Sequence, residues 1–430
     1  MMERYREYKE SGVKWLGEIP SHWELRKMKY TFSERSQKGF PQEPLLASTQ
    51  THGVILKSQY ENRTVEAIKS LETLKLVEIG DFVISLRSFQ GGLEYAYNRG
   101  IISPAYTILT PIHIKADYFK YLSKSDIFIS LLKSSVTGIR EGQNIDYNKL
   151  KDNLLPIPSE KEQISIGSYL DSATSEIDKA IAKQQKMIDL LNERKQIIIQ
   201  NAVTKGLDEN VEMKESGVES IGRIPIGWKI KKLKYVMRSF GRIGFRGYGT
   251  KDIVDEGQGA ITLSPSNIQE SSMDYSKRTY LSWNKYYESP EIMIENGDVL
   301  MVKTGSSYGK CAIVKNMPME CTINPQLVVF KEHTEMPEYL AYCFQASFAK
   351  FFINTSVIGG TIPTISQEKI NNYVFPFPMK SEQQQIVTYL DSEMQRFDSA
   401  ITNCQRQITL LQERKQIIIN EVVTGKVRVI

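Results

Sequence analysis

The side chains most often used for covalent chemistry are scattered along this sequence rather than grouped. Its four histidines match neither H-E-x-x-H nor a Cys/His metal-ligand spacing: His22, His52, His113 and His333. Its four cysteines include no C-x-x-C pair: Cys311, Cys321, Cys343 and Cys404. We therefore predict no metal site, no disulfide framework and no catalytic residue in this chain.

Two segments approach known motifs without matching them. Gly305 to Cys311 reads G-S-S-Y-G-K-C, which is one residue shorter than a phosphate-binding loop and ends in cysteine. N-P-Q-L at Asn324 is not the N-P-P-[YF]-like site that grips a flipped base, and no F-x-G-x-G cofactor loop is present. These absences weaken an enzymatic interpretation, although residues distant in sequence can still assemble a site.

Basic residues are unevenly distributed, although the net charge of the 430 residues is only +5. Between Trp228 and Lys251 there are basic and aromatic side chains and no acidic one. Such a stretch can neutralise DNA phosphates, but a solvated basic face is an equally good interpretation.

The overall composition is that of an ordinary folded protein, with 41% hydrophobic and 24% charged residues. No stretch approaches the ~18 uncharged apolar residues that span a bilayer. We therefore expect a cytoplasmic protein that does not contact a membrane.

An internal repeat organises the chain. K-E-S-G-V-K-W-L-G-E-I-P-S-H-W begins at Lys9, and K-E-S-G-V-E-S-I-G-R-I-P-I-G-W begins at Lys214. A second block, which contains Y-L-D-S and E-R-K-Q-I-I-I, begins at Pro156 and again at Pro376. The offset between the two copies is larger for the second block than for the first. The segment between the blocks is therefore longer in the second copy.

The segments between these blocks, 31–153 and 236–373, predict mixed α/β domains. Short apolar runs such as F-V-I-S-L and L-V-V-F alternate with Gly, Pro and Asn, as is typical of strands and turns. Short helices are expected near 118–132 and 336–352. Only faint echoes join the two segments, such as Gly80-Asp81 with Gly297-Asp298, which indicates a shared scaffold with different surfaces.

Each block that follows Pro158 or Pro378 predicts one long helix, because about 40 residues pass without proline. Apolar residues recur there at a spacing of three and four, which predicts a coiled-coil seam. The seam residues are Leu170, Ile177, Ile181, Ile188, Leu191, Ile198, Leu390, Met394, Phe397, Ile401, Ile408, Leu411 and Ile418. Gln184, Lys195 and Lys415 interrupt the seam and are expected to set its register. We expect the two helices to pair with each other, antiparallel; alternatively, each packs only on its own globular domain.

This organisation resembles the specificity subunit of type I restriction-modification systems. The resemblance rests on G-x-I-P-x-x-W at Gly17 and Gly222, on P-[IF]-P-x-x-x-E-Q at Pro156 and Pro376, and on the repeated L-[NQ]-E-R-K-Q-I-I-I. It covers essentially the whole chain. It implies an α+β fold with pseudo-two-fold symmetry, in which two target-recognition domains, 1–155 and 207–375, alternate with long helices, 156–206 and 376–430, that form an intramolecular antiparallel coiled coil.

The resemblance also implies a function and partners. In that family each recognition domain reads one half of a bipartite, asymmetric site on double-stranded DNA, and the helices dock two modification (methyltransferase) subunits. Those subunits bind S-adenosylmethionine, so this chain is expected to hold no cofactor, and further restriction/motor subunits cut the DNA.

Candidate DNA-contacting residues lie in the polar, glycine-rich loops of the variable segments. Bases are read by Arg, Lys, Asn, Gln, Ser and Thr, whereas phosphate contacts position the protein. The predicted base contacts are Arg87, Ser88, Gln90, Arg140, Gln143 and Asn144 in the first domain, and Lys303, Thr304, Ser306, Ser307, Tyr308, Lys310, Thr361, Thr364 and Gln367 in the second. Arg242, Arg246 and Lys251 are predicted to contact phosphates, whereas Trp23 and Trp228 are expected to be structural anchors.

Two other functional classes compete with a DNA-recognition subunit. A self-contained restriction enzyme would cleave or methylate DNA as the purified chain alone. A scaffold protein would assemble partners through its helices and show no DNA sequence preference.

Overall fold

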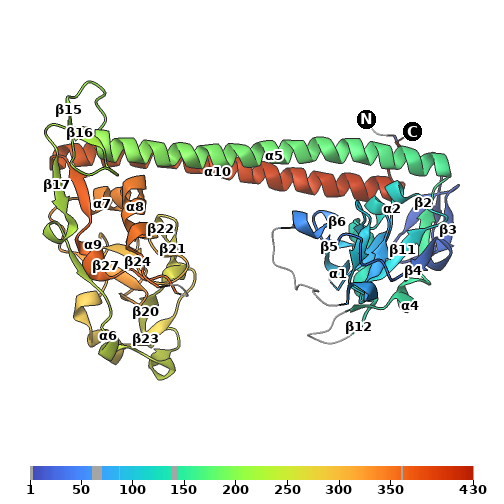
Figure 1. Cartoon of the computed structure of the whole chain (residues 1–430), viewed down its shortest axis with the longest axis horizontal. Coiled ribbons are helices and arrows are strands. Elements are labelled where there is room, and N and C mark those ends of the chain that lie inside the picture. The colour runs from blue at the N-terminus through green and yellow to red at the C-terminus, as the bar shows by residue number, and fades with distance from the viewer. Residues whose placement is uncertain (1–2, 61–69, 87, 138–143, 360–361, 430) are drawn as a thin grey trace. The chain divides into compact units, whose positions relative to one another are not determined.

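The computed structural model describes residues 3–60, 70–86, 88–137, 144–359 and 362–429. Its contacts divide the chain into two units. The first unit comprises residues 1–185 and 405–430, and the second unit comprises residues 186–404. Each unit therefore combines one globular segment with a part of both long helices, α5 (Glu160–Lys205) and α10 (Lys380–Val423) (Figure 1).

In the first unit, an antiparallel sheet of order β4-β11-β8-β9 packs against α2 and α3. Phe82 and Leu109 of the sheet share a core with Phe119 and Phe128 of the helices. The elements are β1 (Tyr8–Glu10), β2 (Glu18–Pro20), β3 (Glu24–Lys27), β4 (Phe32–Arg35), β5 (Leu46–Thr49), β6 (Gly53–Leu56), β7 (Lys75–Val77), β8 (Phe82–Ile84), α1 (Ser88–Gly91), β9 (Glu94–Tyr95), β10 (Gly100–Ile102), β11 (Thr107–Pro111), α2 (Ala116–Leu122), α3 (Asp126–Ser134), β12 (Val136–Thr137), β13 (Asn144–Ile145), α4 (Tyr147–Leu150) and β14 (Leu154–Ile157).

In the second unit, the sheet β18-β27-β24-β25 has the corresponding strand order, and α7 and α8 pack against it. A further four-stranded sheet, β19-β23-β20-β26, contains one parallel pair, β20 with β26. The elements are β15 (Met213–Glu215), β16 (Arg223–Pro225), β17 (Lys229–Lys232), β18 (Arg238–Phe240), β19 (Ile253–Val254), β20 (Gly259–Leu263), β21 (Ile268–Gln269), β22 (Ser272–Met273), β23 (Tyr280–Ser282), α6 (Trp283–Tyr287), β24 (Val299–Val302), β25 (Cys311–Ile313), β26 (Cys321–Ile323), β27 (Leu327–Lys331), α7 (Pro337–Gln345), α8 (Ser347–Ser356), α9 (Gln367–Asn371) and β28 (Val374–Phe377).

The echoed Gly-Asp pairs form the same structure in both units. Gly80 and Gly297 have positive φ angles of 91° and 99°, which glycine tolerates and other residues rarely adopt. The following aspartates, Asp81 and Asp298, accept a backbone hydrogen bond from the residue three positions earlier. The motif therefore builds the turn that precedes β8 in the first unit and β24 in the second, and it is structural.

The long helices contribute to both cores. Ile166 of α5 and Ile419 of α10 are buried in the first unit, and Val203 of α5 and Ile386 of α10 are buried in the second. The alternative that each helix packs only on its own globular segment is therefore wrong. All the predicted seam residues are buried or half-buried, as their spacing of three and four predicts. The predicted α+β class, with long helices, is confirmed.

The same anchors join the globular segment to the helices in each unit. Tyr118 Oη donates to the carbonyls of Pro156 and Val423, and Tyr339 Oη donates to those of Pro376 and Val203. Each phenol thus fastens both the start of one helix and the end of the other. The accepting carbonyls of Pro156 and Pro376 belong to the repeated block and occupy the same position in its two copies.

Tryptophans make a second repeated anchor. Trp23 is fully buried and Trp228 is 2% exposed, and their indole N–H groups donate to Glu162 and Glu382 at 3.4 and 3.1 Å. This burial accords with their predicted structural role.

Candidate nucleic-acid interface

In the second unit, two loops distant in sequence pair to bring predicted residues together. Thr304 and Thr364 form an isolated antiparallel bridge, and the Ile365 N–H donates to the Lys303 carbonyl at 2.8 Å. The Gly305 N–H donates to the Pro363 carbonyl at 3.0 Å. Lys303, Thr304 and Thr364 therefore share one surface, whereas Thr361 lies outside the described residues.

Lys303 has the clearest potential to bind an anion on this surface. Its side chain is half-buried, and desolvation lowers the pKa of its ammonium group. It forms no ion pair with any residue that the structure describes. A Cβ atom built on Gly241 would lie 3.4 Å from both Lys303 Nζ and Gln367 Oε1, so the two side chains converge above that glycine. A DNA phosphate or a guanine edge would supply the missing partner.

Gln367 is held in place rather than free. Its Nε2 donates to the carbonyl and hydroxyl oxygens of Ser239. The amide oxygen remains oriented towards Gly241, so Gln367 can accept one hydrogen bond from a ligand.

Arg242 is a correction to the predicted phosphate contacts. It is 5% exposed, its Nε donates to the Ile323 carbonyl, and its Nη2 donates to Thr322 Oγ1. Because the guanidinium is used inside the fold and covered by Tyr248, it is not available to DNA. Arg246 is half-buried and pairs with Glu291, whereas Lys251 is exposed.

Three of the seven basic residues that precede Lys251 in this stretch form ion pairs with acidic residues from elsewhere in the chain. Lys231 pairs with Glu335 at 2.6 Å, and Arg238 pairs with Glu332 at 3.2 Å. The sequence could not show these pairs because both acids lie far downstream in the chain. The solvated or structural interpretation therefore accounts for much of this stretch.

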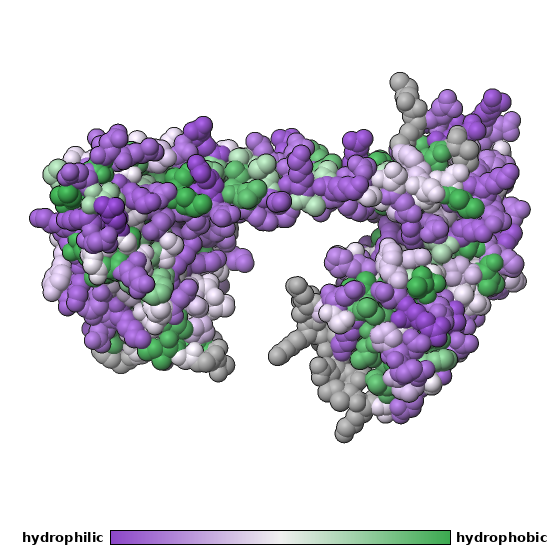
Figure 2. All heavy atoms as spheres, turned by 45° about the horizontal axis from the view of Figure 1, so that its top comes forward, coloured by the Kyte–Doolittle hydropathy of each residue, from purple (hydrophilic) through white to green (hydrophobic). Residues whose placement is uncertain are grey.

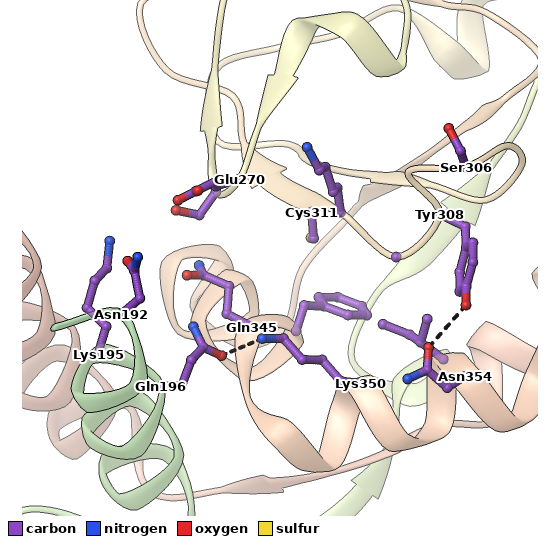
Figure 3. A pocket seen from close by; sticks show the side chains of 15 residues that line it. Asn192, Lys195, Gln196, Glu270, Ser306, Tyr308, Cys311, Gln345, Lys350 and Asn354 are labelled. Carbon is purple, nitrogen blue, oxygen red and sulfur yellow. Dashed lines mark hydrogen bonds between the residues drawn. The ribbon is translucent and has the colours of Figure 1, made fainter. Parts of the chain in front are cut away.

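The remaining predicted residues of the second unit reach a cavity of about 590 Å³ beside helix α5, shown in Figure 3. This second-unit pocket is lined by Ser306, Tyr308 and Lys310 from the loop, by Lys350 and Asn354 from α8, and by Asn192, Lys195 and Gln196 from α5. Tyr308 Oη donates to Asn354 Oδ1 at 3.4 Å, and Lys350 Nζ donates to Gln196 Oε1. Ser307 is half-buried in the same loop.

This loop does not have the geometry of a phosphate-binding loop. Gly305 and Gly309 adopt positive φ angles of 107° and 83°, and the chain continues into strand β25 instead of a helix. Backbone N–H groups at a helix N-terminus, on which a phosphate-binding loop depends, are therefore missing here.

In the first unit, Gln90 is exposed and its Oε1 accepts from Gln50 Nε2 at 3.3 Å. The turn Gln50–His52, between β5 and β6, was missed by the sequence prediction, although its polar residues before Gly53 are a turn signal. Ser88 is a correction: it is fully buried and its hydroxyl accepts from the Ser85 N–H, so it cannot reach DNA.

The other predicted contacts of the first unit are Arg87, Arg140, Gln143 and Asn144. Arg87, Arg140 and Gln143 lie outside the described residues. Asn144 is described only by its backbone, which pairs with Thr137.

A second cavity, of about 870 Å³, lies in the first unit beside helix α10. This first-unit pocket is lined by Gln412, Lys415 and Gln416 of α10, which are the repeat counterparts of Asn192, Lys195 and Gln196. Its other walls include Gln50, His52, Tyr97, Lys120 and Lys124. The two units therefore build related pockets with different residues.

No group of three His, Cys, Asp or Glu side chains among the described residues could hold a metal ion. Burial raises the pKa of the Cys321 thiol to about 12 and raises the pKa values of the Cys311 and Cys343 thiols further, which makes them poor nucleophiles. No helix in the described ranges is long and apolar enough to cross a bilayer.

The chain thus has a repeat-built architecture, in which two globular units with polar loops are each fastened to the same two helices. The family model of the type I restriction modification DNA specificity domain matches residues 248–412. The type I restriction enzyme MjaVIII specificity subunit of Methanocaldococcus jannaschii is 26% identical over 366 residues, which cover 82% of this chain and 80% of the relative. The MjaIX specificity subunit of the same organism is 22% identical over 98% of this chain and 97% of its own length.

A solved chain agrees in fold. It comes from a structure described as the basis of complex assembly and conformational transition of the type I restriction-modification system. The similarity has a TM-score of 0.70 and 15% identity, and it covers 94% of this chain and 98% of the solved one. Residues 248–412 therefore match the type I restriction modification DNA specificity domain, and the chain is similar over most of its length to type I restriction enzyme specificity subunits.

Proposed function

We propose that this chain is the non-catalytic DNA-reading subunit of its complex, and that each unit reads one half of a bipartite, asymmetric site. The observation that carries the proposal is a shared turn followed by different loops. At the fifth position after the turn aspartate, the first unit has Leu86 where the second has Lys303. Equivalent positions with different chemistry imply different half-sites.

The two helices pair antiparallel along a coiled coil in this proposal. Lys195 of α5 pairs with Asp398 of α10 in the second unit, and Lys415 of α10 pairs with Asp178 of α5 in the first, both at 2.7 Å. Asp178 precedes Lys195 on α5 by the same number of positions as Lys415 follows Asp398 on α10. This equal and opposite spacing is the register of antiparallel helices, and it supports a pseudo-two-fold arrangement.

The helices also provide a docking surface for two modification subunits. Leu190 and Ile197 of α5 are 50% and 44% exposed, and their repeat counterparts Leu410 and Ile417 of α10 are 46% and 54% exposed. Figure 2 shows hydrophobic residues among hydrophilic ones on the helical segment. Large apolar side chains exposed at repeated positions suit two copies of one partner. That partner would bind S-adenosylmethionine and, with restriction/motor subunits, carry out the chemistry.

The test exchanges segment 31–153 for that of another specificity subunit and maps methylated positions in cells that also contain the modification subunits. One half-site should change and the other should stay the same. A change in both halves would contradict independent reading, and DNA cleavage or methylation by the purified chain alone would contradict a non-catalytic role.

A further inference from the structure

The two pockets beside the long helices differ in how their lysines are neutralised. In the first-unit pocket, Lys120 pairs with Asp171 at 2.6 Å, Lys124 with Glu94 at 2.8 Å, and Lys415 with Asp178 at 2.7 Å. Every lysine that lines this pocket therefore has a carboxylate partner within ion-pair distance.

The second-unit pocket keeps only one of these pairs, between Lys195 and Asp398. Among the described residues, neither Lys310 nor Lys350 forms an ion pair. Glu270, the one carboxylate among the described lining residues, sits on the turn between β21 and β22, outside ion-pair distance of both ammonium groups.

Lys350 reaches into the pocket from α8 and meets only a neutral partner there. Its Nζ donates to the amide oxygen of Gln196, although part of the side chain is exposed to solvent (Figure 3). Desolvation lowers the pKa of this ammonium group, with only partial compensation from the field of Glu270. Because this ammonium group has no ion-pair partner among the described residues, a bound anion would stabilise it.

The neutral groups around the two lysines favour an oxygen-rich anion. Asn192, Gln345 and Ser306 line the same cavity, and their side-chain amide and hydroxyl groups can donate hydrogen bonds. The cavity of about 590 Å³ is large enough for a phosphate together with the sugar attached to it.

We propose that the second-unit pocket binds a phosphate group through Lys310 and Lys350, and that the first-unit pocket does not. The phosphate belongs either to the DNA backbone, in which case the inference rests on the proposed function, or to a free nucleotide. Lys310 belongs to the loop that also carries Lys303, so a backbone phosphate held here would fix the position of the base-reading loop.

The experiment compares the full-length chain with Lys310→Gln, Lys350→Gln and the double variant, each assembled with the modification subunits. Lys120→Gln in the first-unit pocket is the matched control, because it makes the same charge change. One arm measures binding of duplex DNA that contains the recognition site at several salt concentrations. The other arm titrates AMP and inorganic phosphate calorimetrically. Circular dichroism checks folding. Because Lys310 and Lys350 are both exposed, each single substitution should leave the fold intact, so each single variant tests the pocket.

If the phosphate is that of DNA, the double variant loses about tenfold in affinity, and the slope of log K against log salt becomes smaller by about 0.9. If it belongs to a free nucleotide, the slope is unchanged but AMP and phosphate binding disappear in the double variant. Either result supports the pocket, provided that Lys120→Gln behaves like the unaltered protein. No difference in either arm, or an equal loss in Lys120→Gln, overturns it. Absence of any sequence preference in the unaltered complex would instead contradict the proposed function, and the nucleotide arm would still test the pocket.

Discussion

The first and second units are fastened to the helices by equivalent contacts, yet their pockets and loops have different charges. Tyr121 and Tyr342 donate to Asp171 and Asp391 at the same distance of 2.6 Å. By contrast, strands β9 and β25 occupy the same place in their sheets but differ in charge. Buried Glu94 of β9 corresponds to Ala312 of β25. The two units have thus kept residues that fasten the globular segment to the helices, while the charges around the two pockets differ.

Replacing the two anchoring tryptophans should have the largest effect on the free energy of unfolding. Trp23→Ala and Trp228→Ala each remove a buried indole and its hydrogen bond, so each should lower the free energy of unfolding by about 3–5 kcal/mol. Hydrogen exchange should place the loss in the altered unit. Tyr30→Ala and Tyr235→Ala are matched controls, because these repeat counterparts are 57% and 69% exposed. A loss below about 1 kcal/mol at either tryptophan would show that the two anchors are not equivalent.

The exposed helix positions test whether both copies bind the same partner. Leu190→Glu and Leu410→Glu should each weaken binding of a modification subunit by about 2 kcal/mol or more, because each buries a charge in an apolar contact. Titration of the modification subunit should then give one remaining site in each single variant and none in the double variant. Thr402→Glu, at an exposed polar position of α10, is the control. Undiminished binding of two copies by the double variant would exclude docking at these positions.

The buried carboxyl group of Glu94 should make the free energy of unfolding of the first unit depend on pH, and the second unit should lack this dependence. Burial, partly offset by Lys124, raises the pKa of Glu94 to about 7 from 4.5. The folded state therefore binds this proton more tightly than the unfolded state. The stability that protonated Glu94 contributes is fully present below pH 4.5, the unfolded pKa, and is lost as the pH rises through about 7, the folded pKa. Between pH 5 and pH 8 the loss should be on the order of 1–3 kcal/mol.

Glu94→Gln should remove that part of the pH dependence, as measured by denaturant unfolding at both pH values. The change should appear in the first unit alone, since Ala312 cannot titrate. An identical pH dependence in Glu94→Gln and the unaltered chain would mean that Glu94 is ionised throughout this range.

The ion pairs between the two helices should make the smallest contribution to the free energy of unfolding. Double-mutant cycles on Lys195 with Asp398, and on Lys415 with Asp178, should each give coupling of about 0.2–1 kcal/mol, because one partner of each pair is largely exposed. The two couplings should agree, since the pairs occupy equivalent positions. Coupling in only one of them would argue against a single antiparallel register.

The sequence was sufficient where structure depends on neighbouring residues. Spacing of three and four predicted α5 and α10, and the short helices expected near 118–132 and 336–352 appear as α2–α3 and α7–α8. Each of these short predictions divides into two helices, and the first divides at Ser123–Ser125, where Ser125 caps α3. Local rules identified the elements but not this break.

The candidate site was predicted only in part. The loop from Lys303 and the segment that contains Thr364 were both chosen from their composition, but their pairing and the convergence of Lys303 with Gln367 arise from long-range contacts. Composition could not distinguish the buried Arg242 and Ser88 from exposed neighbours of the same type. It also could not identify Gln50, which approaches Gln90 through the β5–β6 hairpin.

By itself, the sequence determined the internal repeat and the two long amphipathic helices, because motifs and periodicity can be read from residues close together in the chain. Only the tertiary structure decided which charges are neutralised. Lys231 meets Glu335, Arg246 meets Glu291, and Lys350 meets no acid among the described residues. An ion pair depends on distance in space, and the fold sets that distance independently of separation along the chain.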